Sequence, residues 1–455
     1  MTRPPHASVR TLLAAVALLI SVAVGGCRRP PENQPTVVFI VLDNVRSDRL
    51  SACGYQRPTS PYLADLCAEP TSRCSCNAQA PSSWTLPSHA SFFTGTEVPE
   101  HGAGFGGQGG GNVRLGPGTH ARPLDARLPT LAETFAEAGY ETIAVSANPL
   151  VSPASGLTRG FAVVEHARDF GKLYGARFVQ KLEETLAASS REQPLFLFLN
   201  IADAHRPWFE IPSSVDWLPP RSYLSFKQKP GRSNPERKRF VTGQMPPEEA
   251  AELLAHLNDV YDFAVHRADQ TLRGVLRVLR DGGWLADEPG FRVVITSDHG
   301  EHLGEHGLMG HAGPYLFEEL TRVPLVVLSN SPGRELPRQL SALVSYDLLQ
   351  GGQPRRRPLR ATAFASDTWP LWYGPEIGGQ PAAAVWNGNR KTVSHDGQIS
   401  CFDLQADPGE TTPLACEDDS SVAEIEALLQ TLQSVASGEE LDPAMLELLE
   451  SLGYL

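Results

Sequence analysis

Five short runs rich in β-branched and aliphatic residues are spaced along the chain. They run from Thr36 to Leu42, Glu141 to Ser146, Pro194 to Ile201, Arg292 to Thr296 and Val323 to Leu328. Continuous apolar runs are typical of strands buried on both faces of a parallel sheet. Helical periodicity lies between the runs, from Leu128 to Ala138 and from Pro247 to Arg280. We therefore expect an α/β fold with a doubly covered, mostly parallel sheet.

The composition bounds the class of protein. The chain has 455 residues, of which 41% are hydrophobic and 20% charged. These fractions exclude a disordered polyelectrolyte and a multi-span membrane protein. The net charge is −13, and no lysine or arginine run is long enough to follow a phosphate backbone. We expect no nucleic-acid partner.

Residues 1–27 have the pattern of a signal peptide. The apolar run from Thr11 to Val24 is about 14 residues long, whereas a spanning helix needs roughly 20. Two glycines directly before Cys27 resemble the bacterial lipoprotein cleavage box, so we expect lipidation at Cys27. Residues 28–35 would then be a tether, and the protein an exported lipoprotein anchored on the periplasmic or cell-surface side. A plain secretory peptide is the alternative.

Export would place the other cysteines in an oxidising compartment. They are Cys53, Cys67, Cys74, Cys76, Cys401 and Cys416. Three disulfides are possible in 15 pairings, and the short spacing makes Cys401 and Cys416 the natural pair. A metal cluster is the alternative.

Parts of the chain between and after the apolar runs differ from this α/β pattern. The segment from Trp208 to Met245 is rich in Pro, Arg, Lys and Ser and is interpreted as a surface excursion over the site. Strand candidates near 382–393 and 398–404 indicate a small antiparallel appendage, and the acidic helix-like end from 421 to 455 is expected to pack on the body. We place the main domain at 36–345 and an α+β C-terminal subdomain with a helical tail at 346–455.

Several chemically active residues follow the expected strands. Asp43, Asp203 with His205, and Asp298 with His299 should emerge at one edge of the sheet. A carboxylate next to an imidazole, as in Asp298-His299, suits one cation with mixed oxygen and nitrogen ligands. His302, His306 and His311 follow in a glycine-containing loop, where some histidines would face a substrate. For His302 and His306, plain exposed loop positions are the alternative.

The segment APSSWTLPSHASFFTG, residues 80–95, puts Thr85 near the start of a helix. A helix N-terminus carries partial positive charge that favours anions and a lowered hydroxyl pKa. The alternative is that Thr85 or Ser88 only caps the helix.

Six segments together resemble the sulfatase family of the alkaline phosphatase superfamily. They are VVFIVLDNVRSDRLSACGYQRPTSPYL, PSSWTLPSHASFFTG, FLNIADAHRPW, YDFAVHRADQTL, TSDHGEHLGEHGLMGHAGPYLFEELTRVP and CFDLQADPGETTPLA. They cover about residues 36 to 416. The resemblance implies a metal-dependent hydrolase of anionic esters, with a large α/β domain and a smaller C-terminal subdomain.

The resemblance also assigns residues. Asp43, Asp298 and His299 would hold one divalent cation, with Thr85 as a further ligand and the nucleophile. His205 would face the ester oxygens, and His311 would face the leaving oxygen. His89 and Lys391 would bind the substrate. The family favours Ca²⁺, while an imidazole ligand leaves Mn²⁺ or Zn²⁺ open. We expect no second metal ion.

Two positions depart from the family. Asn44 stands where many sulfatases have a second aspartate. The nucleophile pentad, residues 85–89, reads TLPSH and lacks the Cys or Ser that sulfatases convert to formylglycine, so we expect no formylglycine. Because a threonine ester must be cleared by attack at sulfur or phosphorus, a phosphodiesterase or phosphoryl-alcohol transferase is an alternative to a sulfuric ester hydrolase. A third alternative is an inactive binding lipoprotein. The expected partner is an anionic ester, with glycans and lipid head groups as candidates.

Overall fold

The structure is a computed structural model that describes residues 34–105, 121–208, 215–218, 235–311, 315–330, 333–364, 380–416 and 419–435. The expected signal peptide with Cys27 and residues 28–33 of the tether lie outside the described residues, as do parts of the 208–245 excursion and of the tail. None of the helices in the described ranges combines the length and apolar character that a bilayer crossing requires.

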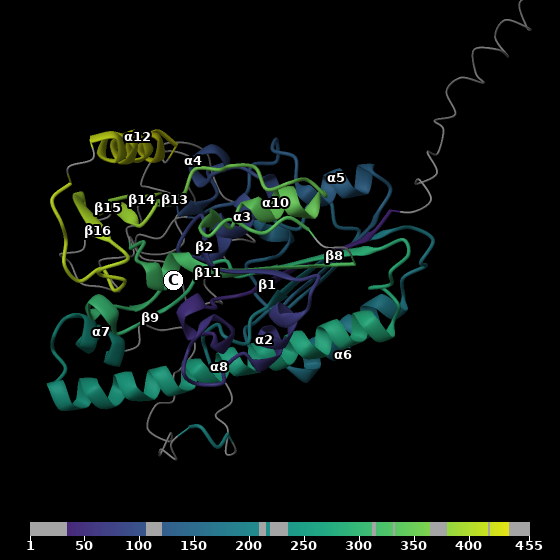
Figure 1. Cartoon of the computed structure of the whole chain (residues 1–455), viewed down its shortest axis with the longest axis horizontal. Coiled ribbons are helices and arrows are strands. Elements are labelled where there is room, and N and C mark those ends of the chain that lie inside the picture. The colour runs from purple at the N-terminus through teal and green to yellow at the C-terminus, as the bar shows by residue number, and fades with distance from the viewer. Residues whose placement is uncertain are drawn as a thin grey trace, which may run out of the picture.

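An eight-stranded sheet forms the centre of the molecule, in the order β12-β2-β11-β8-β1-β7-β5-β6 (Figure 1). Its strands are β1 (Thr36–Leu42), β2 (Arg73–Gln79), β5 (Glu141–Ser146), β6 (Val163–His166), β7 (Leu195–Ile201), β8 (Phe291–Thr296), β11 (Arg322–Ser329) and β12 (Leu340–Ser341). The five strands from β8 to β6 are parallel, and β11 is antiparallel to both of its neighbours. The predicted mostly parallel sheet is confirmed.

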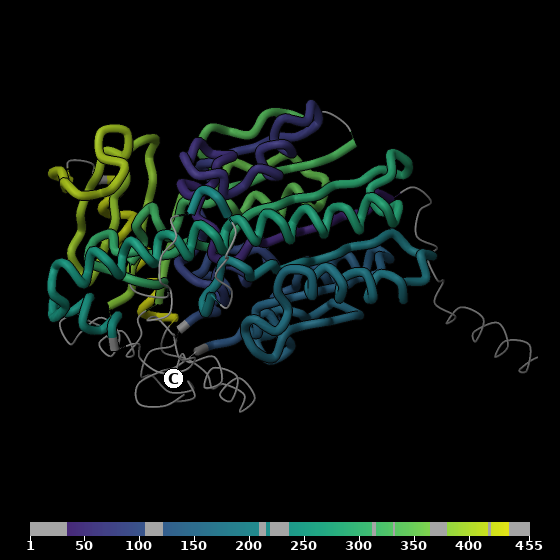
Figure 2. The backbone as a smooth tube through the Cα atoms, turned by 90° about the horizontal axis from the view of Figure 1, so that it is seen from below, coloured from purple at the N-terminus to yellow at the C-terminus, as the bar shows by residue number. Residues whose placement is uncertain are grey.

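Helices cover both faces of this sheet. Alternate residues of the fully buried β1 point into two separate cores, Val37 and Phe39 into one, Val38 and Ile40 into the other. The first core packs against α3 (Thr85–Thr94), α5 (Leu131–Glu137) and α10 (Val344–Leu349), the second against α2 (Pro61–Ala68), α6 (Ala176–Ala187) and α8 (Pro247–Asp281). Figure 2 shows α8, in teal, running along the length of the body. Burial on both faces explains the continuous apolar runs.

Strand β2 was not predicted, because its sequence RCSCNAQ carries no apolar run. It pairs with β11 and β12, and two disulfides tie it to the preceding segment, Cys53–Cys76 and Cys67–Cys74. The expected Cys401–Cys416 pair is also a disulfide. All six cysteines are thus paired with one another, which contradicts the metal-cluster alternative.

The expected C-terminal appendage is a four-stranded antiparallel sheet. It consists of β13 (Arg360–Ala363), β14 (Ala382–Asn387), β15 (Arg390–His395) and β16 (Gln398–Asp403). Helix α12 (Asp419–Val435) packs on it through a cluster that includes Ala383 and Ile425. The smaller elements are α4 (Val98–His101), α7 (Pro235–Val241), α9 (Glu318–Thr321), the pair β3 (Gly104–Phe105) and β4 (Ala121–Arg122), and the pair β9 (His302–Leu303) and β10 (Met309–Gly310).

Candidate active site

The ends of four parallel strands meet at one edge of the sheet. Asp43 follows β1, Asn148 follows β5 by two residues, Asn200 lies near the end of β7, and the pair 298–299 follows β8. All of these side chains are buried. This edge, at the carboxyl ends of the strands, is where α/β proteins bind their ligands.

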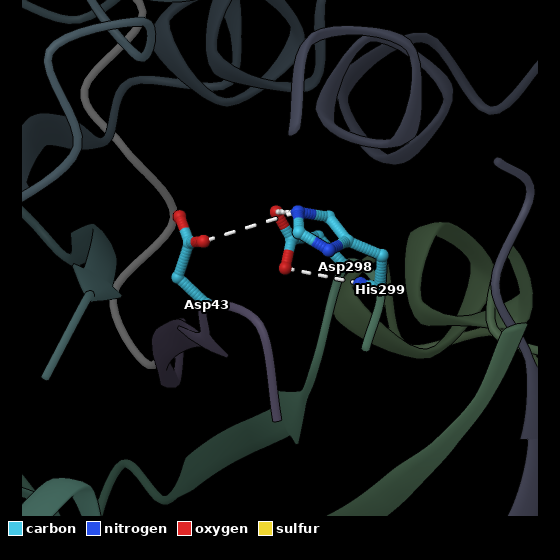
Figure 3. A group of neighbouring side chains, drawn as sticks. All are labelled: Asp43, Asp298 and His299. Carbon is cyan, nitrogen blue, oxygen red and sulfur yellow. Dashed lines mark hydrogen bonds and ion pairs between the residues drawn. The ribbon is translucent and has the colours of Figure 1, made fainter. Parts of the chain in front are cut away.

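Asp43, Asp298 and His299 form a compact group whose ligand atoms lie within 4.8 Å of one another. Figure 3 shows both carboxylates facing the imidazole, with His299 Nε2 at 3.4 Å from Asp298 Oδ2 and at 4.0 Å from Asp43 Oδ1. These two carboxylate oxygens are buried and have no hydrogen-bond partner among the described residues. Unpaired buried oxygens are costly, so the group fits a bound cation.

The tautomer of His299 also suits a metal ligand. Its Nδ1 lies 2.9 Å from the carbonyl oxygen of Gly300, which can only accept, so Nδ1 carries a proton. The Nε2 atom, which faces the two carboxylates, then presents its lone pair to the same point. A ring nitrogen fixed by a backbone carbonyl in this way is usual for ligating histidines.

The pKa values of the two carboxylates shift in opposite directions. Burial raises the pKa of Asp298 above its ordinary value, and the Asp43 carboxylate raises it further. Burial also raises the pKa of Asp43, but the imidazoles of His205, His299 and His89 outweigh it and hold the pKa below the ordinary value. A divalent cation between the two would favour the ionised form of both.

Thr85 is the first residue of α3 and is fully buried beside this group. Its Oγ1 lies 3.4 Å from His299 Nε2 and accepts a hydrogen bond from Asn148 Nδ2 at 3.2 Å. Because Thr85 opens the helix, the partial positive charge of the N-terminus adds to the field at this oxygen. The expected placement of Thr85 at a helix start and next to the proposed ligands is therefore observed.

His89 lies behind Thr85, one helical turn further along α3. It is fully buried; Nδ1 donates to the carbonyl oxygen of Thr85 at 2.9 Å, and Nε2 accepts from Asn200 Nδ2 at 3.3 Å. Both ring nitrogens are thus used within the protein. In this structure His89 supports the backbone at Thr85, whereas the sequence led us to expect a substrate contact.

His205 and His311 lie beside the group, with 5.0 Å between their ring centroids and 4.4 Å between those of His311 and His299. Phe170 stacks on His205 at 4.2 Å and holds its ring. Burial lowers the pKa of His205, although the Asp43 carboxylate raises it. The structure therefore brings both histidines to the site, and burial favours the neutral imidazole at His205.

Glu301 orients His311. Its Oε2 lies 2.6 Å from His311 Nδ1, and its Oε1 pairs with Arg206. Burial raises the pKa of Glu301, but Arg206 and His311 hold it well below the usual range. Burial lowers the pKa of His311 to about 3, although the Glu301 carboxylate raises it. His311 is therefore a neutral imidazole whose proton lies on Nδ1, and its Nε2 is the acceptor.

Lys391 is fully buried in β15, and its ammonium group is used by the protein. It donates to the carbonyl oxygen of Leu316 at 2.6 Å and lies 2.8 Å from Glu410 Oε1, 3.3 Å from Glu318 Oε1 and over the Trp386 ring. None of these partners belongs to the group around Thr85. Lys391 thus joins the C-terminal sheet to the segment before β11, which differs from its expected substrate contact.

The remaining loop histidines differ from each other. His302 is 1% exposed, which contradicts the alternative of an exposed loop position. His306 stacks on Phe317 at 3.6 Å between centroids and lies 3.6 Å from Glu319 Oε2. His306 as a residue is exposed, which agrees with the alternative of an exposed loop position, although its imidazole packs on Phe317.

Three residues of the site were missed in the sequence, namely Asn148, Asn200 and Glu301. Asn200 and Glu301 lie within segments matched to the family but carry no distinctive spacing, and Asn148 lies outside those segments. The position of Asn148 just beyond a predicted strand is the one signal that pointed to it.

Comparisons with known proteins agree with this architecture. The sulfatase family model matches residues 35–349. An uncharacterized sulfatase of Escherichia coli, YidJ, is 27% identical over 170 residues, 35% of this chain and 31% of the relative. An arylsulfatase of Klebsiella aerogenes is 25% identical over 243 residues, 46% of this chain and 50% of the relative. The chain thus spans half or less of the length of these curated relatives.

Solved structures share the fold at lower sequence identity. The phosphonate monoester hydrolase of Agrobacterium radiobacter superimposes with a TM-score of 0.61 at 18% identity, covering 88% of this chain and 96% of its own. BT4656, solved with its substrate D-glucosamine-2-N,6-O-disulfate, gives a TM-score of 0.55 at 16% identity, with 89% and 98% covered. The match of the family model over most of the chain, together with the geometry at the sheet edge, shows that the chain belongs to the sulfatase family.

Proposed function

We propose that the protein is a metal-dependent hydrolase of sulfuric or phosphoric esters that uses Thr85 as its nucleophile. The observation that carries the proposal is the position of Thr85 Oγ1, buried at a helix N-terminus and 3.4 Å from His299 Nε2 of the candidate cation group. A hydroxyl becomes an effective nucleophile where positive charge stabilises its alkoxide.

The proposed reaction has two displacement steps. Thr85 Oγ attacks the sulfur or phosphorus atom, the bond from that atom to the leaving oxygen breaks, and a covalent Thr85 ester forms. His311 takes the proton of the Thr85 hydroxyl and delivers it to the leaving oxygen. Water then attacks the Thr85 ester, and His311 carries a proton from the water to Thr85 Oγ, which restores the enzyme and releases the acid.

The chain's residues have separate roles in these steps. Asp43, Asp298 and His299 would hold the divalent cation; Ca²⁺ is proposed from the family, and Mn²⁺ or Zn²⁺ from the imidazole ligand. When bound, such a cation supplies positive charge that stabilises the transition state. His205, held by Phe170, would orient the anionic ester, and Glu301 would hold His311 in the tautomer whose Nε2 takes up and delivers the proton.

Transfer to phosphorus has support of its own. A threonine ester lacks the second hydroxyl through which a formylglycine sulfate ester is expelled. A phosphodiesterase or phosphoryl-alcohol transferase therefore suits Thr85, and one protein that shares this fold is a phosphonate monoester hydrolase. One protein that shares this fold was solved with its substrate D-glucosamine-2-N,6-O-disulfate and another with k-i-k-neocarrahexaose, so a sulfated sugar is a second candidate substrate. The expected lipid anchor at Cys27 remains part of the proposal.

The decisive experiment compares three substrate classes in one panel. The full-length protein with added divalent metal is assayed on an aryl sulfate, a bis-aryl phosphate and an aryl phosphonate monoester, beside the Thr85→Ala variant. We expect turnover of at least one class and a loss of more than about 10³-fold in Thr85→Ala. Equal turnover by the variant would remove Thr85 from the mechanism. Absence of both turnover and metal binding would instead favour an inactive binding protein.

A further inference from the structure

Asn148 makes a contact that distinguishes it from the other buried amides at the site. Its side chain is fully buried, and Nδ2 lies 2.8 Å from Asp43 Oδ2 and 3.2 Å from Thr85 Oγ1. The orientation of the amide is fixed, because Oδ1 accepts from the backbone N–H of Leu150 at 2.9 Å. The two hydrogens of Nδ2 therefore point to the two acceptors.

The direction of these hydrogen bonds follows from the chemistry of the partners. An ionised Asp43 oxygen only accepts, so one hydrogen of Nδ2 is directed to it. The other is directed to Thr85 Oγ1, which accepts. A preorganised donor aimed at an oxygen that gains negative charge lowers the barrier of the step in which that charge develops.

We infer that Asn148 is a catalytic residue that stabilises Thr85 Oγ as an oxyanion, above all when the Thr85 ester is hydrolysed. This inference rests on the proposed function. In the second step, water attacks sulfur or phosphorus, the bond from that atom to Thr85 Oγ breaks, and the electron pair stays on Oγ until a proton arrives. An aliphatic alkoxide is a poor leaving group, and a threonine ester has no other route of release. A hydrogen-bond donor at Thr85 Oγ therefore stabilises the leaving alkoxide in the step that has the poorest leaving group.

Asn200 provides a matched control within the same site. Its Nδ2 lies 2.9 Å from the same oxygen of Asp43 and 3.3 Å from His89 Nε2, and no contact joins it to Thr85; its Oδ1 accepts from the backbone N–H of Asn148 at 3.1 Å. Asn148→Ala and Asn200→Ala each remove one donor from Asp43 Oδ2. Only Asn148→Ala also removes the donor from Thr85 Oγ1.

The test measures the covalent ester as well as turnover. The full-length wild type, Asn148→Ala, Asn148→Asp and Asn200→Ala are mixed with the panel substrate that the wild type turns over best. The reactions are quenched rapidly, and the fraction of chain carrying an ester at Thr85 is read by mass spectrometry. Metal affinity is measured by calorimetry, and folding by thermal unfolding. Asn148→Asp keeps the side-chain shape and the acceptor for Leu150, so it guards against a misfolded alanine variant, and its metal affinity shows whether the added carboxylate beside Asp43 disturbs the cation group.

We expect Asn148→Ala and Asn148→Asp to lower kcat by about 10²-fold, as for the loss of one oxyanion donor, and to accumulate the Thr85 ester at steady state. Asn200→Ala should weaken metal binding without accumulating the ester. Equal kcat and equal ester fractions in Asn148→Ala and Asn200→Ala would overturn the inference and leave Asn148 as a support of Asp43. The Thr85→Ala variant separates this failure from failure of the proposed function. If the two asparagine variants behave alike and Thr85→Ala is inactive, only the inference about Asn148 fails. If Thr85→Ala stays active, the proposed function itself fails.

Discussion

Oε2 of Glu301 lies 2.6 Å from Nδ1 of His311, so this buried carboxylate sets the tautomer of the imidazole. Arg206 pairs with Glu301 and keeps it ionised. The proposed proton carrier is therefore oriented by a fixed charge, which is a common arrangement of catalytic histidines.

Glu301→Gln should reduce kcat by about 10²-fold, the usual contribution of a positioned acid–base group. The amide loses the charge that orients His311, while the size of the side chain hardly changes. Steady-state kinetics on the best panel substrate measure the effect. Glu305→Gln is the control, because Glu305 lies in the same loop but pairs with Arg46. Equal losses in both variants would point to disturbance of the loop instead of His311.

Asp298→Asn should abolish binding of one divalent ion per chain, because the variant loses a charge from a group with two unpaired buried oxygens. Calorimetry and metal analysis of the purified protein measure the stoichiometry. The wild type should also gain thermal stability when metal is added, since binding to the folded state alone raises Tm by mass action. A wild type that neither binds metal nor shifts its Tm would contradict the assigned ligands.

The parts of the site that were predictable follow strands or carry family motifs. Asp43, Asp298 and His299 were found because strand ends converge in a parallel sheet, and Thr85 because a helix opens there. Such positions depend on local sequence and topology alone. Both faces of the central sheet are buried, so its strands are continuous apolar runs. The sheet was predicted from those runs.

The parts that were not predictable depend on side chains that meet across large separations in sequence. Asn148 reaches Asp43 over 105 positions, and Lys391 reaches Glu318 over 73. An amide or a lysine in a sequence gives no sign of which partner it meets. Strand β2 was missed for a similar reason. It has no apolar pattern, and it is held instead by disulfides and by pairing with β11.

His101 should make the fold sensitive to acid. It is buried, its Nδ1 accepts from the backbone N–H of Ala103 at 3.0 Å, and its other nitrogen lies 2.9 Å from Ser91 Oγ. Burial lowers its pKa from 6.5 to about 3. A proton on Nδ1 would face the backbone N–H of Ala103 and break that hydrogen bond. Protonation of His101 is therefore unfavourable in the folded state.

Because the folded pKa lies below the unfolded one, the stabilisation is present above pH 6.5 and is lost as the pH falls towards 3. The free energy of unfolding should fall by up to about 1.4 kcal/mol per pH unit in this window. Urea unfolding of wild type and His101→Gln between pH 7 and 4 measures the difference in slope. Parallel curves would show that His101 does not contribute.

Lys391 faces two buried carboxylates, Glu410 and Glu318, and cannot neutralise both. Burial raises the pKa of Glu410 to about 7, although Lys391 lowers it. The folded pKa lies above that of the unfolded chain, so this contribution to stability is present below about pH 4.5 and is lost as the pH rises through 7. Glu410→Gln should therefore flatten the stability curve between about pH 4.5 and 7.

Lys391→Met tests whether the lysine is structural or contacts the substrate. Removing one partner of a buried ion pair costs about 3–5 kcal/mol, because the remaining charge is left without compensation. We expect Lys391→Met to lower Tm strongly, and the double variant with Glu410→Gln to recover part of the loss. KM, measured at a temperature where both variants are folded, should stay close to the wild-type value. A rise in KM with unchanged stability would instead restore the substrate contact expected from the sequence, and would require Lys391 to leave Glu410 and Glu318 when the ester binds.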